Sequence, residues 1–321
     1  IFGLYSQENC PNQINFLMQG LKHLQHRGQE SYGIAYQIDR DLICENSLGL
    51  VPNFPENHEF SIRTNKCIGH VRYSTSGSSK SIYKDKFNEC QPLSGKCSLG
   101  HFFLAHNGNI PNLVAHDTQH IVNFIEKRKE KSWIDIFIQL LENIPASYCL
   151  LIITEHEIFA IRDRYGIRPL CIGVHKNTNF CVSSESCALQ NYEYLREVQA
   201  GEVVKFDSNG LESLYVSSSA NSHICAVECI YFMNEYSLCN GFLIREIRKT
   251  LGIALARKEE LSFDRNNTIA IGVPQTGITS AIGYANELNI RYIQAITKNK
   301  DIGRTFILPT DIERKVICEK K

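Results

Sequence analysis

The sequence predicts an α+β layered domain over residues 1–220, followed over 221–321 by an α/β domain with a parallel sheet. Three observations support this fold class. Short apolar runs broken by Gly, Asn and Ser fill the first 220 residues, which is typical of strands and hairpins. The small, polar stretch 216–223 has the composition of a linker. Beyond it, the pattern changes to strand, loop, helix and strand, which is a βαβ unit.

The elements of the first domain follow from the spacing of apolar residues. We expect a helix over 15–25, where Leu17, Leu21 and Leu24 lie on one face. Strands are expected at 67–73 and 101–106, and a buried strand at 148–153. Between them, one helical stretch over 118–141 carries apolar residues at near-helical spacing: Ile121, Ile125, Ile134, Ile138 and Leu141.

The second domain begins with a helix whose apolar face carries Ile244, Ile247, Leu251 and Leu255. A strand at 268–273, a loop at 274–277, a helix at 279–288 and a strand at 290–296 complete the βαβ unit. A parallel sheet of two strands is not a viable domain by itself. We therefore expect the second domain to be incomplete in this chain.

Charge and composition exclude several classes of function. The 321 residues include 34 basic and 34 acidic side chains, so zero net charge gives no reason to expect a nucleic-acid partner. No apolar run approaches the ~20 residues that cross a bilayer, so no membrane association is expected. The 13 cysteines form no CxxC pair, and no charged-then-apolar leader is present. We expect mostly reduced cysteines that act as small hydrophobes in a cytoplasmic protein.

Two clusters in the first half combine charge with glycine. Arg27-Gly28 ends the first helix, which indicates ordinary C-capping. Arg72 lies in the strand at 67–73, on the face opposite its two neighbours. An arginine there is most often part of a structural ion pair. Its guanidinium would also suit a substrate carboxylate, which it can bind through two charge-assisted hydrogen bonds.

The stretch 105–109 is the most informative part of the first domain. Asn107-Gly108 by itself indicates a tight turn. An Asn carboxamide beside a Gly backbone N–H also provides the two donors that hold an oxyanion in acyl transfer. Asp117 opens the next helix, where it is either an N-cap or a carboxylate that binds an ammonium group.

Another cluster of this kind lies in the second domain. The turn Pro274-Gln275-Thr276-Gly277 joins a strand to a helix, where free backbone N–H groups suit an anion, although it could equally be a plain structural turn. Lys298 and Arg304 follow in a basic segment, which is either a phosphate-binding loop or a solvated surface turn.

Together these clusters resemble the class II glutamine amidotransferases, and within them the amidophosphoribosyltransferase family. The resemblance covers nearly the whole chain. It is carried by His26-Arg27-Gly28-Gln29-Glu30-Ser31, Arg72-Tyr73-Ser74-Thr75, Gln91-Pro92, Arg162-Asp163-Arg164-Tyr165-Gly166-Ile167-Arg168-Pro169-Leu170, Ser184-Glu185-Ser186-Cys187-Ala188, 225–232, 272–283 and 298–307. It implies an N-terminal-nucleophile hydrolase fold, layered α/β/β/α, over 1–220. An incomplete phosphoribosyltransferase domain is implied over 221–321.

The resemblance also implies a reaction and its residues. Glutamine would be hydrolysed by an N-terminal cysteine whose α-amino group acts as the base. Arg72 would bind the glutamine α-carboxylate, Asp117 its ammonium group, and Asn107 with Gly108 the oxyanion. The ammonia would convert phosphoribosyl pyrophosphate to 5-phosphoribosylamine, the committed step of purine biosynthesis. That second substrate would be bound by Pro274, Gln275, Thr276, Gly277, Lys298 and Arg304, with Thr276 beside its Mg²⁺.

Further cofactors and partners are implied by resemblance alone. Cys225 matches one ligand position of the four-iron, four-sulfur (4Fe–4S) cluster that some family members carry, and a buried hydrophobic role is the alternative. Purine nucleotides are expected as feedback inhibitors, and the protein as a homo-oligomer, either a tetramer or a dimer.

The chain departs from the family pattern at several places. Ile1-Phe2-Gly3-Leu4-Tyr5 resembles the family's Cys-Gly-type start from its third residue onward, so the nucleophile is expected just before Ile1. Cys10 is internal and has no free α-amino group, so it does not replace the nucleophile. The signature that binds the ribose phosphate is absent. Residues 114–117 connect the stretch 105–109 to the next helix, and this connection is shorter than the family usually has. Gln275 stands where an acid is common. We expect a clipped chain, and a fragment without the cysteine is expected to be inactive.

Two other functions remain open. One is a different class II amidotransferase, such as a glucosamine-phosphate, asparagine or glutamate synthase, which the βαβ unit disfavours. The other is a non-catalytic regulatory homologue, whose natural N-terminus would lack the cysteine.

Overall fold

The computed structural model describes the chain except for residues 54–61, 74–88, 112–116, 177, 300–310 and 320–321. The described residues form two compact units, and the chain passes from one to the other between Cys225 and Ala226. The boundary therefore follows the expected linker by a few residues. Within the described ranges, no helix is both long and apolar enough to span a membrane.

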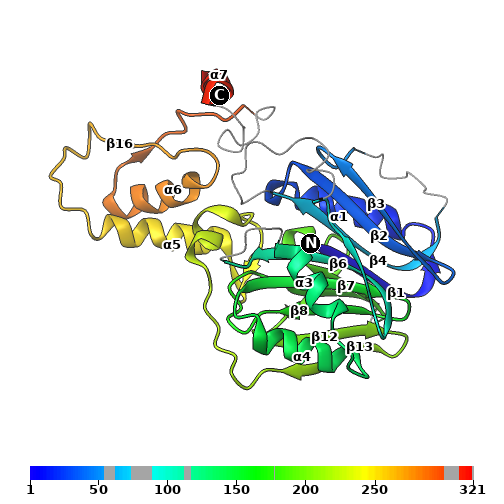
Figure 1. Cartoon of the computed structure of the whole chain (residues 1–321). Helices are drawn as coiled ribbons and strands as arrows, with labels where there is room; N and C mark the ends of the chain where they lie inside the picture. Colours follow the sequence, from blue (N-terminus) through cyan, green and yellow to red (C-terminus); the bar gives the residue numbers. More distant parts are fainter. Residues whose placement is uncertain (54–61, 74–88, 112–116, 177, 300–310, 320–321) are drawn as a thin grey trace. The chain divides into compact units, whose positions relative to one another are not determined.

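Two antiparallel sheets form the first unit (Figure 1). The seven-stranded sheet has the order β11-β9-β10-β1-β4-β2-β3, and the six-stranded sheet the order β13-β12-β8-β7-β6-β5. The strands predicted at 67–73, 101–106 and 148–153 are confirmed as β4, β6 and β7. The strands are β1 (Phe2–Cys10), β2 (Ser31–Ile38), β3 (Asp41–Leu48), β4 (Thr64–Arg72), β5 (Leu93–Cys97), β6 (Gly100–Asn109), β7 (Ser147–Thr154), β8 (Ile158–Arg162), β9 (Cys171–His175), β10 (Asn179–Ser183), β11 (Glu193–Glu197), β12 (Glu202–Asp207) and β13 (Gly210–Val216).

Helices cover the outer faces of both sheets, so the first unit has the expected α/β/β/α layers (Figure 1). Side chains such as Ile68 of β4 and Leu151 of β7 are fully buried between the sheets. Helix α1 (Gln13–His23) packs Leu17 and Leu21 against the seven-stranded sheet. Helices α3 (Asp117–Glu126) and α4 (Trp133–Asn143) cover the six-stranded sheet with a second apolar cluster.

The single helical stretch expected over 118–141 is wrong, because the structure has two helices there. Helix α3 ends at Glu126 and a charged run follows. Ser132 then caps α4: its backbone is extended, with φ −142° and ψ 153°, and its Oγ accepts from the Asp135 N–H at 3.4 Å. A serine in this geometry satisfies an N–H that the helix leaves free, so it starts a new helix.

The second unit contains the predicted βαβ unit. Strand β16 (Ile269–Ala270), helix α6 (Gly277–Leu288) and strand β17 (Arg291–Tyr292) follow one another, and β16 pairs with β17 in parallel. Its other elements are the π-helical turn η3 (Glu228–Phe232), strands β14 (Leu238–Cys239) and β15 (Phe242–Leu243), and helices α5 (Ile244–Ala256) and α7 (Asp311–Glu319).

Glycine lets α5 and α6 approach closely. A Cβ added at Gly252 would lie 1.9 Å from the carbonyl oxygen of Ser280, and one at Gly283 would lie 2.3 Å from that of Lys249. No larger side chain fits at either position, so these two glycines set the distance between the helices.

Candidate functional site

Asn107 and Gly108 lie inside strand β6, so the tight-turn interpretation of this pair is wrong. They pair with Cys149 and Tyr148 of β7. A Cβ added at Gly108 would lie 2.2 Å from the Ser147 carbonyl oxygen. Close strand packing, and not a turn, therefore requires glycine here.

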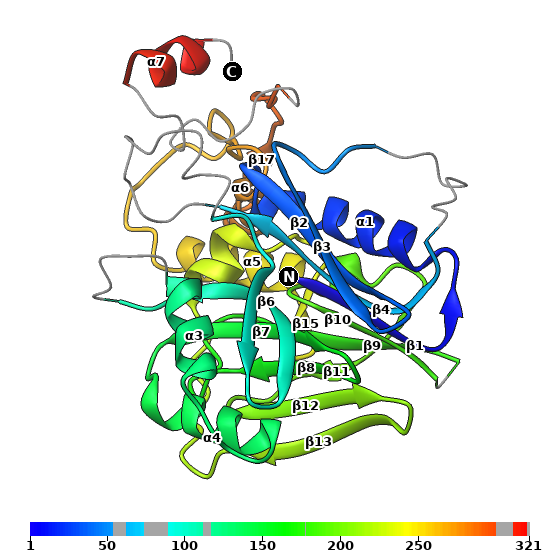
Figure 2. The same cartoon turned by 45° about the vertical axis from the view of Figure 1, so that its right-hand side comes forward.

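The first residue of the chain lies beside Asn107. The nitrogen of Ile1 is buried and donates to Ser184 Oγ at 2.9 Å, and Asn107 Nδ2 donates to the same oxygen at 3.3 Å. The Ser184 N–H in turn donates to the Ile1 carbonyl at 3.0 Å. Figure 2 shows the start of the chain near β6. Ser184 thus joins the chain's first residue to the predicted oxyanion residue, a link between residues that local sequence patterns could not reveal.

The Ile1 amine lies in an environment that disfavours positive charge. Burial, reinforced by the Arg27 guanidinium, lowers its pKa to about 5, while Glu185 opposes the shift. A charged ammonium is therefore unfavourable at this nitrogen near neutral pH.

His106 connects Asn107 to Asp117. It precedes Asn107 in β6, and its Nδ1 lies 3.9 Å from Asp117 Oδ1. Burial lowers the pKa of His106 to about 4, although the Asp117 carboxylate opposes this, so the ring is neutral near pH 7. Asp117 is the first residue of α3 and accepts from the Thr118 N–H at 2.9 Å. The structure thus shows a local contact with the next N–H for Asp117, and both its N-cap role and its ammonium-binding role remain predictions.

Gln91 holds this part of the site together. Its Oε1 accepts from the His106 N–H at 2.7 Å, and its Nε2 donates to Thr118 Oγ1 at 2.9 Å. His106 Nδ1 lies 3.1 Å from the same hydroxyl. One glutamine side chain therefore fixes β6 against the start of α3.

His70 is a buried residue of the site that sequence reasoning did not single out. It lies in β4, and its pKa is well below the usual value, mainly because of burial. The Ile1 amine, His106 and Arg72 lower it further, so His70 lies within electrostatic range of all three groups. Its position near Arg72 in the sequence was the one available signal.

Arg72, the last residue of β4, forms the ion pairs that the structural interpretation expects. Its Nη1 donates to Glu30 Oε2 at 2.9 Å, and its Nη2 pairs with Glu89. The side chain is only 11% exposed, so the two carboxylates hold the guanidinium in a fixed place. Binding of a substrate carboxylate by Arg72 remains a prediction.

The helix C-cap interpretation of Arg27-Gly28 needs correction. Helix α1 ends at His23, and a 3-10 turn (Gln25–Arg27) follows. Gly28 is extended, with φ −161°, and an added Cβ would lie 2.5 Å from the Val71 carbonyl oxygen. Glycine is needed there for close approach to β4, not for a left-handed cap.

Beneath the site lies a buried ion pair that the sequence did not reveal. Arg27 Nη1 pairs with Glu185 Oε1, and His26 Nε2 lies 2.8 Å from the same oxygen. The Glu185 side chain is fully buried and that of Arg27 is 5% exposed. Because Glu185 follows Ser184, this pair anchors the segment that holds Ile1.

In the second unit, Pro274, Gln275, Thr276 and Gly277 form the expected strand-to-helix turn. The Gly277 N–H donates to the Val273 carbonyl at 3.0 Å, and α6 begins at Gly277. The peptide bond between Pro274 and Gln275 is cis. An anion-binding role for this turn remains a prediction.

The remaining predicted residues are less informative. Lys298 is exposed, and Arg304 lies outside the described residues, as do 74–79 and 115–116 of the sequence motifs. None of the thirteen cysteines forms a disulfide bond, and six of them are buried. Cys225 is half-buried, and in the described part of the chain no three His, Cys, Asp or Glu side chains form a group that could hold a metal. An iron–sulfur cluster at Cys225 therefore remains a prediction.

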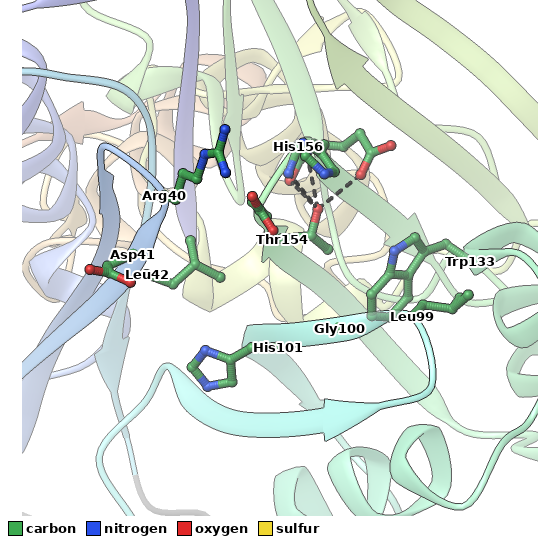
Figure 3. A pocket seen from close by; sticks show the side chains of 11 residues that line it. Arg40, Asp41, Leu42, Leu99, Gly100, His101, Trp133, Thr154 and His156 are labelled. Atoms are coloured by element: carbon green, nitrogen blue, oxygen red, sulfur yellow. Dashed lines mark hydrogen bonds between the residues drawn. The ribbon is translucent and has the colours of Figure 1, made fainter.

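A cavity of about 220 Å³ lies elsewhere in the first unit (Figure 3). It is lined by hairpin residues such as Arg40 and His156, together with His101 and Trp133. His101 and Asn107 are six residues apart along β6, which corresponds to roughly 20 Å at 3.3 Å per residue. The cavity is therefore separate from the predicted glutamine site.

Comparisons with known proteins support the family that the sequence predicted. Residues 78–191 match a family model described as a glutamine amidotransferase domain. The chain is 34% identical to an amidophosphoribosyltransferase of Synechocystis sp. over 98% of its own length and 66% of the relative. It is 33% identical to the Bacillus subtilis amidophosphoribosyltransferase, over 98% and 67% of the two chains.

A solved structure agrees with these sequence relatives. The glutamine phosphoribosylpyrophosphate amidotransferase of B. subtilis matches 98% of this chain and 70% of its own, with 32% identity and a TM-score of 0.80. The chain thus spans about two thirds of the length of the relatives that it matches. The α+β layered fold, the enzyme class and the family predicted from the sequence are confirmed, and the chain belongs to the amidophosphoribosyltransferase family.

Proposed function

We propose that the complete protein hydrolyses glutamine in its first unit and uses the ammonia in its second unit to convert phosphoribosyl pyrophosphate to 5-phosphoribosylamine. This is the first committed step of purine biosynthesis. The observation that carries the proposal is the convergence of Ile1 N and Asn107 Nδ2 on Ser184 Oγ. It brings the start of the chain to the residue that the family pattern assigns to the oxyanion.

The nucleophile in this proposal is the cysteine of the family's Cys-Gly start, in which Ile1 matches the third residue. A charged amine at that nitrogen is disfavoured, as its pKa of about 5 indicates. A peptide N–H at this position would carry no charge and would keep the hydrogen bond to Ser184. The preceding carbonyl carbon would lie only about 1.33 Å from Ile1 N. In the family start this preceding residue is a glycine, and the cysteine comes before it.

The reaction then follows from ordinary acyl-transfer chemistry. The cysteine α-amino group takes the thiol proton, and the thiolate attacks the side-chain carbonyl of glutamine. Asn107 Nδ2 and the Gly108 N–H stabilise the oxyanion, and the protonated amine gives its proton to the departing ammonia. Water then cleaves the thioester and releases glutamate.

The substrate's two charged groups have candidate partners in the first unit. Arg72 would bind the α-carboxylate while sharing its guanidinium with Glu30 and Glu89, and Asp117 would bind the ammonium group. Arg72 already pairs with Glu30 and Glu89, so a substrate carboxylate would have to share the guanidinium with them or displace one of them.

In the second unit, the turn from Pro274 to Gly277 would bind the pyrophosphate, with Lys298 and Arg304 balancing its charge. Mg²⁺ would arrive bound to this substrate, and Thr276 is the residue that would lie beside it. The B. subtilis relative was solved with ADP and GMP. We therefore also propose inhibition by purine nucleotides, and assembly into a tetramer or dimer.

The test uses the full-length natural protein with Mg²⁺, phosphoribosyl pyrophosphate and either glutamine or an ammonium salt. We expect glutamate and pyrophosphate with glutamine, and pyrophosphate alone with ammonium. Arg72→Ala should raise the KM for glutamine and leave the ammonium-dependent rate unchanged. If neither nitrogen source yields pyrophosphate, the proposal is wrong and a non-catalytic homologue is the better description.

A further inference from the structure

Ser184 holds both backbone polar groups of Ile1. It lies between β10 and the 3-10 turn η2 (Ser186–Ala188), and it is fully buried. Its N–H donates to the Ile1 carbonyl at 3.0 Å, while its Oγ accepts from Ile1 N at 2.9 Å. One residue therefore fixes the position and direction of the backbone at Ile1.

The same oxygen also orients Asn107. A hydroxyl oxygen has two lone pairs, and here one accepts from Ile1 N and the other from Asn107 Nδ2. The hydroxyl hydrogen must then point elsewhere, so Ser184 presents only an acceptor to Asn107. A carboxamide has nearly the same shape after a 180° flip. The acceptor selects the orientation with Nδ2 toward Ser184 and leaves the second N–H of that nitrogen free to donate.

The contact also spans the two sheets. Ile1 leads into β1 of the seven-stranded sheet, whereas Asn107 belongs to β6 of the six-stranded sheet. The distance between Ile1, which matches the third residue of the family's Cys-Gly start, and the oxyanion donor thus depends on one oxygen atom. Displacement of a reacting group by about 1 Å can cost on the order of a hundredfold in rate.

We propose that Ser184 is a positioning residue for glutamine hydrolysis. It orients Asn107 Nδ2 toward the developing oxyanion and fixes the backbone that carries the nucleophile, without contacting the substrate. This inference rests on the proposed function of the first unit.

The test compares Ser184→Ala with wild type in the full-length protein. We expect kcat for glutamine hydrolysis to fall roughly tenfold to a hundredfold, which is no more than the loss caused by removing an oxyanion donor. The KM for glutamine should stay within about twofold of the wild-type value. The ammonium-dependent rate should be unchanged, since it does not use this site. Ser184→Cys keeps the shape but offers a weak acceptor, so it should lose kcat with less risk to folding.

A double-mutant cycle separates positioning from mere structure. If Ser184 acts through Asn107, adding Ser184→Ala to Asn107→Ala should cost much less than it costs in wild type. Ser6→Ala is the matched control. Ser6 is also a buried serine, in the middle of β1, and its hydroxyl donates to the backbone oxygens of Glu8 and Asn65. This variant should keep kcat.

Several outcomes overturn the inference. An unchanged kcat in Ser184→Ala and Ser184→Cys would show that the hydroxyl does not matter, and full additivity with Asn107→Ala would show that it does not act through Asn107. An equal loss of the ammonium-dependent rate would indicate a general structural defect. Failure of the proposed function itself is distinct, because wild-type protein would then release no glutamate from glutamine.

Discussion

Replacing Gly108 with alanine tests the oxyanion site through sterics alone. The new methyl group would lie 2.2 Å from the Ser147 carbonyl oxygen, 2.7 Å from Tyr148 Cα and 2.6 Å from His106 Nε2. Non-bonded heavy atoms normally approach to about 3.5–4.0 Å. Because two of these atoms belong to the backbone of β7, β6 and β7 must separate locally by about 1 Å.

This separation should affect both stability and catalysis. Overpacking of this kind costs about 1–3 kcal/mol in the free energy of unfolding, and we expect the upper part of that range because backbone must move. A shift of about 1 Å in the Gly108 N–H should lower kcat for glutamine hydrolysis by roughly a hundredfold. The KM for glutamine should change little.

Urea unfolding and glutamate release measure the two effects in the full-length protein. The ammonium-dependent formation of pyrophosphate provides an internal control, since it bypasses glutamine hydrolysis. Asn109→Ala, at an exposed position of the same strand, should keep wild-type stability. Wild-type stability together with wild-type kcat in Gly108→Ala would refute both the packing argument and the oxyanion assignment.

Three further predictions concern the first unit's electrostatics and capping. Glu185→Gln removes the carboxylate charge that pairs with the buried Arg27 and should lower the free energy of unfolding in urea by about 3–5 kcal/mol. Arg257→Ala breaks an exposed ion pair and should lower it by less than about 1 kcal/mol. Equal losses would contradict the burial argument. The folded-state pKa of His106, about 4, lies below its ordinary value of 6.5, so the unfolded state binds more protons between these pH values and the free energy of unfolding should rise with pH from about 4 to 6.5. Unfolding measured at several pH values should show a smaller slope for His106→Asn. An unchanged slope would count against a buried neutral ring. Ser132→Ala removes the α4 N-cap and should lower the unfolding free energy by about 1 kcal/mol, measured by thermal denaturation, and no loss would mean that the cap contributes little.

Local patterns predicted those parts of the fold that depend on neighbouring residues. Strands β4, β6 and β7 and the βαβ unit follow from short-range hydrophobic patterning, and the structure has them. The break between α3 and α4 was also present in the spacing. Ile125 and Ile134 are nine residues apart, which places them about half a turn out of phase at 3.6 residues per turn.

The supporting residues of the site could not be predicted in this way. Ser184 meets Ile1 across a sequence separation of 183 residues, and Glu185 meets Arg27 across 158. Family motifs marked Asn107, Arg72 and the 184–188 segment as important. They did not show that the serine hydroxyl joins the two sheets, because that depends on how the sheets pack.

The contact between Ile1 and Ser184 also has a consequence for the order in which the protein acquires activity. Closing a loop of this length has a large entropic cost, which only the packed sheets can offset. A chain still being synthesised before Ser184 emerges can therefore hold neither Ile1 nor Asn107 in its final place. Glutamine hydrolysis should begin only when the first unit has finished folding, so partly made chains would release no ammonia.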